Sequence, residues 1–177
     1  SQELLRSVLE EFPVIYAKEW QQLFRLKLGL QLAHDGDTKL IEHLLQAMHD
    51  SQVDFTSFFR SLSNIGKNSQ PSDIAQRDQF IDRDNIDHWL NDYIDRLQLE
   101  DMSDDSRREL MNRYNPKYIL RNHLAQAAIE KAQQDDFSEI ERLQLILSKP
   151  FDEQELFEAY AKPPPVDMQR IEVSCSS

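Results

Sequence analysis

Glycine is scarce in this 177-residue sequence, which contains only Gly29, Gly36 and Gly66. Loops that bind nucleotide phosphates bring several backbone N–H groups close to the anion, and glycines permit this approach because they have no side chain. Three glycines so far apart cannot form such a loop. We therefore expect no glycine-rich nucleotide-binding loop within these residues.

Cysteine and long apolar runs are scarce as well. The only cysteine is Cys175, so no internal disulfide framework can form, and nothing indicates an oxidising compartment. No apolar run approaches the roughly 20 residues that span a bilayer, and no secretory signal is visible at the start. We expect a cytoplasmic protein without a membrane-embedded segment.

Basic clusters are also lacking. The chain has 32 acidic and 20 basic residues, which gives a net charge of −12. A surface of this charge repels phosphate backbones, and no block of lysine or arginine reverses the sign locally. Nucleic acids and anionic membranes are therefore not expected as partners.

What the sequence does contain is helical periodicity. Apolar residues recur at steps of three and four along most of its length, which predicts an all-α fold. Pro13 interrupts the first stripe and should kink that helix or divide it in two. The expected apolar stripes cover residues 4–28, 40–48, 55–62, 86–97, 120–132 and 137–147.

Several polar residues indicate where helices begin. Asp54 can cap the helix that follows it, and Ser103, followed by two acids, is a favourable start for another. Asn115-Pro116 predicts a further start, with a cap residue and then proline at the first helical position. Asp136 with Glu139 resembles a capping box.

The histidines give little sign of a metal site. No two of them are four residues apart, and the zinc-binding pattern HExxH is absent. A metal site, or a metal-dependent helical hydrolase, would need histidines and acids that converge in space. Surface or half-buried histidines are the simpler interpretation. The five are His34, His43, His49, His88 and His123.

Three short stretches invite a functional interpretation. "DDFSE" at 135–139 resembles a kinase metal-binding triplet, but Ser138 stands where glycine is required. "IDRDNIDHW" resembles a kinase catalytic loop, but Trp89 stands where asparagine is expected. Arg121 and Asn122 interrupt an apolar face. They either pair with carbonyls or acids where helices meet, or contact a partner outside these residues.

Longer stretches show a family resemblance. "NPKYILRNHLAQAAIEKAQQDD", "RLQLILSKPFDE" and "PPPVDMQRIEVSCSS" resemble, in order and spacing, the C-terminal end of the selenoprotein O family. "RDQFIDRDNIDHWLNDY" and the acidic segment 101–108 are similar to the region just upstream. The last motif is specific, because Cys175 stands where some members carry selenocysteine, two residues from the end.

The resemblance implies a protein-kinase-like fold and transfer of AMP from ATP to hydroxyl groups of protein substrates, with Mg²⁺ or Mn²⁺. The family's nucleotide lysine, metal-binding residues and catalytic base lie upstream of the region that matches. We thus expect residues 1–160 to be a helical C-terminal part of such an enzyme, inactive alone, and 161–177 to be a proline-rich tail. The absence of an initiating Met, and a start within a helical pattern, agree with a fragment.

The resemblance also implies partners. Cys175 could exchange disulfides with a thiol in the missing N-terminal kinase-like lobe and so control activity, or it could be an unreactive exposed thiol. The face that met that lobe is expected on helix 4–28, where its exposure would favour a homodimer. The alternative is a free-standing helical interaction module that uses the acidic surface or Pro163–Pro165.

Overall fold

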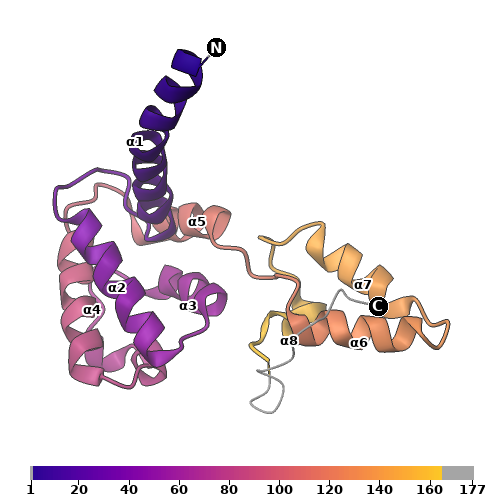
Figure 1. The fold of residues 1–177 in the computed structure, drawn as a ribbon. Helices are drawn as coiled ribbons and strands as arrows, with labels where there is room; N and C mark the ends of the chain where they lie inside the picture. The colour runs from indigo at the N-terminus through magenta and orange to yellow at the C-terminus, as the bar shows by residue number, and fades with distance from the viewer. Residues whose placement is uncertain (1, 165–177) are drawn as a thin grey trace. The chain divides into compact units, whose positions relative to one another are not determined.

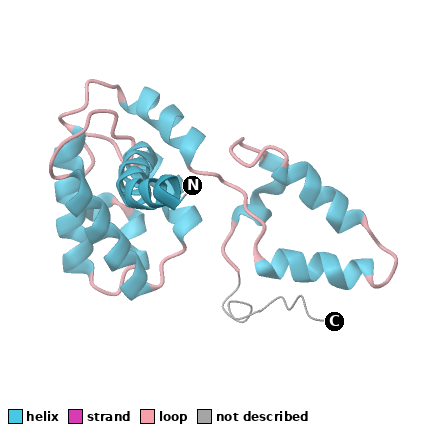
Figure 2. Cartoon of the chain, turned by 45° about the horizontal axis from the view of Figure 1, so that its top comes forward, coloured by secondary structure: helices cyan, strands magenta, loops and turns pink. Residues whose placement is uncertain are grey.

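A computed structural model describes residues 2–164 and shows helices joined by turns, with no strand in that range (Figures 1 and 2). The predicted all-α fold is therefore confirmed. The chain divides into two compact units, Ser1–Tyr114 and Asn115–Ser177. Each unit is described by itself below.

The first unit contains five α-helices and three short 3₁₀ turns. The 3₁₀ turns are Leu62–Asn64, Pro71–Asp73 and Ala75–Gln79. The helices are α1 (Gln2–Lys27), α2 (Asp37–Ser51), α3 (Phe55–Ser61), α4 (Arg83–Leu97) and α5 (Asp104–Tyr114).

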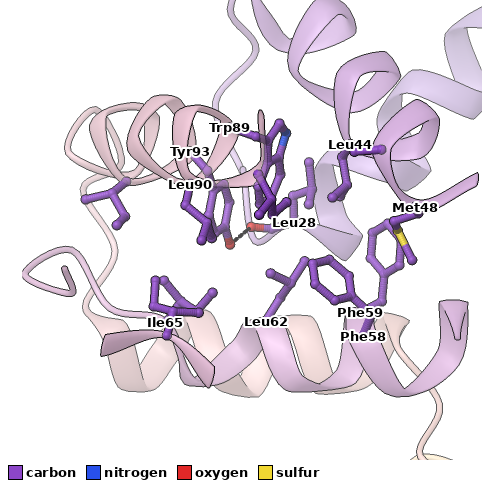
Figure 3. Close-up of a cluster of buried hydrophobic side chains, with 14 of the residues drawn as sticks. Leu28, Leu44, Met48, Phe58, Phe59, Leu62, Ile65, Trp89, Leu90 and Tyr93 are labelled. Atoms are coloured by element: carbon purple, nitrogen blue, oxygen red, sulfur yellow. Dashed lines mark hydrogen bonds between the residues drawn. The ribbon is translucent and has the colours of Figure 1, made fainter. Parts of the chain in front are cut away.

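The core of this unit lies between α2, α3 and α4 (Figure 3). Helix α4 supplies much of it because its apolar residues recur every three or four positions and are buried together. The rings of Trp89 and Tyr93 stack with their centroids 5.0 Å apart. Phe58 meets Phe80 edge-on at 5.2 Å. The apolar stripe expected at 86–97 is thus the buried face of a helix.

Pro13 does not divide α1, which runs unbroken from Gln2 to Lys27. Among the α1 residues whose side chains the structure describes, Trp20 and Phe24 near the C-terminal end pack on the core. The N-terminal half of α1 extends beyond the other helices of the unit (Figure 1). There, the backbone carbonyl that Pro13 leaves without a helical donor can be met by water.

Two predicted helix starts are confirmed. The carboxylate of Asp54 accepts a hydrogen bond from the backbone N–H of Ser57 at 2.9 Å, which caps α3. The hydroxyl of Ser103 accepts one from the backbone N–H of Ser106 at 3.2 Å, at the start of α5. Both caps act within one turn of the chain, so the local sequence is enough to specify them.

The second unit contains α6 (Asn122–Ala132), α7 (Ser138–Leu147), a 3₁₀ turn at Glu155–Phe157 and α8 (Glu158–Ala161). The predicted helix start at Asn115-Pro116 is wrong. The backbone N–H groups of Lys117 and Tyr118 donate instead to the carbonyl of Pro150, at 2.8 and 3.1 Å. This pairing with a distant segment keeps the chain out of a helix until Asn122.

The predicted capping box at α7 is also wrong. Phe137 is the N-cap residue, and the carboxylate of Asp136 accepts from the backbone N–H of Ser138 at 3.0 Å. Glu139 does not reach back to the helix start. It is buried, and its carboxylate accepts hydrogen bonds from the hydroxyl of Tyr160 at 2.6 Å and from the amine of Lys131 at 2.9 Å.

Candidate functional site

Between residues 9 and 23, α1 presents a stripe of large apolar side chains to solvent. At 100° per residue, the five residues of the stripe fall within about 120° of the helix circumference. From the first to the last, the stripe is about 21 Å long. Val14 is also exposed but points away from it. We call the stripe the α1 face; it consists of Leu9, Phe12, Ile15, Tyr16 and Leu23, which are 44–71% exposed.

Aromatic packing fixes the C-terminal end of α1 to the unit. The ring of Phe24 lies 4.6 Å from that of Trp20 and meets Phe55 and Phe59 edge-on at 6.3 and 6.0 Å. Lys27 lies over the Phe55 and Phe59 rings at 5.6 and 5.8 Å. These contacts hold one end of α1 while the α1 face extends beyond them.

Lys27 adds a polar tie at the same place. Its amine donates to the carbonyl of Tyr114, at the end of α5, at 2.9 Å. Burial lowers the pKa of the Lys27 amine below its ordinary value. Burial therefore works against the positive charge, whereas the aromatic faces and the helix C-terminal carbonyl favour it.

A buried polar cluster secures the turn that follows α1. We define it as Asp37, Arg96 and Glu100. The carboxylate of Glu100 accepts hydrogen bonds from the backbone N–H groups of residues 31 and 32, at 3.0 and 3.2 Å. The guanidinium of Arg96 donates to the carbonyl of Leu32 at 2.7 Å. The backbone of this turn therefore bonds to side chains from α4 and the residues that follow it.

The charges of this cluster are paired, with one arginine between two carboxylates. Arg96 donates to Asp37 at 2.7 Å and to Glu100 at 3.0 Å, and all three side chains are at most 9% exposed. Asp37 also accepts from the backbone N–H of His34 at 3.0 Å. A buried ion is tolerated only when it is paired and hydrogen-bonded, and each member of this cluster meets that condition.

The sequence analysis missed this cluster, although one signal was present. Arg96 lies three residues after Tyr93 and seven after Trp89, on the apolar face of α4. A charged residue at such a position indicates a buried ion pair. Glu100 follows Arg96 by four residues, a spacing that allows a local ion pair. Nothing in the local pattern identified Asp37 as the second partner, because it is 59 residues away along the chain.

A second buried arginine joins α5 to the same turn. Arg107 is 1% exposed and donates to the carbonyl of Ile65 and to Asp104. Gly29 lies against it with a φ of +72°, and a Cβ atom at Gly29 would be only 2.6 Å from Cγ of Arg107. This close approach requires glycine at position 29.

In the second unit, polar contacts fasten α8. Glu139 on α7 accepts from the hydroxyl of Tyr160, and the guanidinium of Arg142 donates to the same two groups at 2.8 and 3.2 Å. The guanidinium of Arg121 donates to the carbonyl of Ala161 at 3.4 Å. The interpretation that Arg121 satisfies a carbonyl where helices meet is therefore confirmed. Asn122 is the first residue of α6.

Of the remaining candidate residues, two histidines come together, since the ring centroids of His43 and His88 lie 6.3 Å apart. Cys175 lies outside the described residues. His43 shares a hydrogen bond with Asn85 at 2.8 Å, while His88 lies 3.5 Å from Asp92. Within residues 2–164, no three His, Cys, Asp or Glu side chains are grouped so as to hold a metal ion. Over the same range, no helix has both the length and the apolarity to cross a bilayer.

Comparison with known proteins gives a consistent result. The family model described as "Protein adenylyltransferase SelO" matches residues 1–148. A "Protein nucleotidyltransferase YdiU" from Burkholderia ambifaria is 48% identical over 172 residues, which cover 97% of this chain and 33% of that relative. The protein of the same name from Burkholderia cenocepacia is 49% identical over the same coverage. The chain thus spans about a third of the length of the curated relatives it matches.

Proposed function

Because the chain belongs to the SelO family of protein adenylyltransferases, we propose that it is a non-catalytic part of an enzyme that transfers AMP from ATP to protein hydroxyl groups. In that reaction a Ser, Thr or Tyr oxygen attacks the α-phosphorus, a phosphodiester forms, and pyrophosphate leaves. The reaction class rests on the description of the family and on the name of the relatives. The assignment of this chain to a supporting role is the step that we add.

We assign ATP and Mg²⁺ or Mn²⁺ to the part of the enzyme outside these 177 residues. The reason is that each of the three glycines occupies a different turn of this chain. Gly29 packs on Arg107 and Met111, and Gly66 lies against the carboxylate of Asp104. Gly36 caps α2. Each glycine serves a separate turn, so none is available to a shared phosphate-binding loop.

The same proposal gives the α1 face its role, which is to pack on the remainder of the enzyme. The exposed stripe is the observation that supports this. Exposed apolar stripes of this size mark surfaces that are covered in the complete assembly. The relatives are about three times as long as this chain, and their additional residues provide the occupant. Protein substrates and a cytoplasmic location belong to the proposal as well; the location rests on the single cysteine.

The test compares AMP transfer from labelled ATP by three proteins: the full-length enzyme, the enzyme lacking these residues, and this chain alone. We expect labelling by the full-length enzyme, less by the truncated one, and none by the chain. The size of the drop measures what this part contributes. Labelling by the chain alone would overturn the supporting role.

We also propose that Cys175 is a redox control, through disulfide exchange with a thiol elsewhere in the enzyme. Its position in the resemblance supports this, as does the fact that the chain has no second cysteine with which to pair. Replacing Cys175 with serine in the full-length enzyme should remove the effect of oxidant on AMP transfer. Activity that ignores oxidant both before and after the substitution would leave Cys175 as an unreactive thiol.

A free-standing interaction module is the second candidate, and the α1 face favours it too. In that case the chain would be a complete functional protein, and the face would bind a separate partner or a second copy. Sedimentation of the purified chain, and the open reading frame around it, separate the two candidates. A dimer broken by Phe12→Asp, from a gene that encodes only this chain, would favour the module.

A further inference from the structure

Glu19 lies in the middle of the α1 face. Its neighbours on the helix surface are Ile15, Tyr16 and Leu23, four and three residues before it and four after it. These three side chains are 56%, 59% and 44% exposed, and Glu19 is exposed as well. An otherwise apolar stripe therefore has a carboxylate at its centre.

This carboxylate has no cation of its own. The positions three and four residues away on α1 hold Ile15, Tyr16, Gln22 and Leu23, so the helix offers it no ion pair. In the described part of the chain, Glu19 has no ion-pair partner from another element either. In the chain by itself this is harmless, because water solvates the carboxylate.

Docking of the α1 face would remove that water. A carboxylate that is covered together with its apolar neighbours is strongly disfavoured unless a positive charge pairs with it. We infer that the surface that covers the α1 face presents an arginine or lysine side chain to Glu19. This inference rests on the proposed docking of α1 to the remainder of the enzyme and adds the chemistry of the docking surface.

A second copy of the chain does not supply this cation through its own α1 face. At 100° per residue, Arg6, Lys18 and Arg25 point at least 60° outside the arc of the face. Lys27 falls at the edge of the arc, but its amine already donates to the carbonyl of Tyr114 at 2.9 Å. Two α1 faces in contact would place Glu19 against apolar side chains or against the other Glu19. The charge pattern of the face thus favours a different surface, which the additional length of the relatives can provide.

The sign of a stability change tests the inference. Glu19→Gln and Glu19→Met keep a helix-favouring side chain of similar length but remove the charge. If a basic residue faces Glu19, both substitutions leave that residue buried and unpaired, and the Tm of the full-length enzyme falls by roughly 2–4 °C or more. Without such a residue, the Tm is unchanged, or Glu19→Met raises it, and the inference is wrong.

Controls separate this effect from damage to the helix. The same two substitutions in the 177-residue chain should leave its Tm unchanged, because Glu19 is solvated there. Glu42, an exposed glutamate within α2, is the matched position for both substitutions in the full-length enzyme. If the substitutions at Glu42 lower the Tm of the full-length enzyme as much as those at Glu19, the effect is a general one of lost negative charge, and this counts against the inference.

Footprinting distinguishes failure of the inference from failure of the docking proposal. Hydroxyl radicals report the exposure of Phe12, Tyr16 and Leu23, while carbodiimide coupling to an amine reports that of the Glu19 carboxylate. We expect all four to be protected in the full-length enzyme and labelled in the chain alone. Protection of the apolar residues with free labelling of Glu19 would overturn the inference only. Labelling of all four in the full-length enzyme would overturn the docking of α1 itself.

Discussion

The hydroxyl of Tyr93 donates a hydrogen bond to the backbone carbonyl of Leu28 at 2.7 Å, and both residues are completely buried (Figure 3). Leu28 is the residue directly after α1, and Tyr93 is on α4, 65 residues further along the chain. This bond and the neighbouring polar cluster fix the turn at the base of α1. The direction in which the α1 face extends is therefore set by contacts that the face does not make itself.

Replacing Tyr93 with phenylalanine should destabilise the chain by about 1–3 kcal/mol. The substitution keeps the ring that stacks on Trp89 but leaves the carbonyl of Leu28 buried without this donor. Urea denaturation followed by tryptophan fluorescence measures the loss. A change below about 0.5 kcal/mol would mean that water replaces the hydroxyl.

The same residue predicts a loss of stability at alkaline pH. Burial raises the pKa of Tyr93 from 10.0 to about 12, against the weaker opposing influence of Arg107. The unfolded chain therefore releases this proton first, so stability from this source is full below pH 10 and is lost as pH rises through about 12. The stability of the Tyr93→Phe variant should fall less steeply between pH 10 and about 12 than that of the unsubstituted chain. Denaturation midpoints at pH 8, 10 and 11.5 provide the comparison.

Arg96→Met should be among the most damaging single substitutions in the first unit. It leaves the carboxylates of Asp37 and Glu100 buried without their cation, which typically costs about 3–5 kcal/mol. The matched control is Arg83→Met, since Arg83 pairs with Asp78 at 2.5 Å on an exposed surface. That pair should contribute at most about 1 kcal/mol. Equal losses at the two positions would contradict the distinction between a buried and an exposed ion pair.

Two of the glycines, Gly29 and Gly36, offer a matched pair of substitutions. Gly29→Ala should cost about 2–4 kcal/mol, because the residue has a φ of +72° and its new Cβ would overlap Arg107. Gly36→Ala meets nothing within 4 Å and has a φ of −79°, so its effect should stay within about 1 kcal/mol. Thermal melts of both variants test this, and a larger loss at Gly36 would refute it.

Glu139 predicts an acid-sensitive contact in the second unit. Burial opposes its ionisation, but hydrogen bonds from Tyr160 and Lys131 outweigh burial and hold its pKa below 4.5. Its stabilising contribution is therefore present above pH 4.5 and lost as pH falls through the lowered pKa. Glu139→Gln should weaken the attachment of α8 to α7 at pH 7. Acid should then detach α8 less in this variant than in the unsubstituted chain, because the variant has no carboxylate to protonate at position 139.

NMR signals of the α7 and α8 backbone amides, followed as pH is lowered, report this contact. Glu141→Gln, at an exposed position on the same helix, is the control. If the α8 signals of the Glu139 variant match those of the unsubstituted chain at every pH, the contact contributes nothing measurable.

Helix-capping residues predicted the start of a helix correctly where the cap bonds to a backbone group within the next turn. Asp54 and Ser103 cap α3 and α5 because each bonds to a backbone N–H three residues later. Asn115-Pro116 and Asp136 carry equally good local signals, yet the helices begin elsewhere. In the first case a carbonyl from residue 150 captures two N–H groups that a helix would have used.

Periodicity alone determined that the chain is helical and which helices are amphipathic, whereas the exposed apolar face on helix 4–28 was expected from the family resemblance. Periodicity could do so because the spacing of apolar residues fixes which side chains share a helix face. The sequence motifs also identify the family by themselves. All of these features depend on residues that are close together in the chain or that retain a recognisable order.

Only the tertiary structure decided which charges are buried and which residues hold the base of α1. Arg96 meets Asp37, Tyr93 meets Leu28, and Glu139 meets Tyr160, all across separations that no local pattern encodes. Such pairs form because a buried polar group must find a partner in the folded chain, and packing determines which one is within reach. The sequence supplies the groups, and the fold selects the pairs.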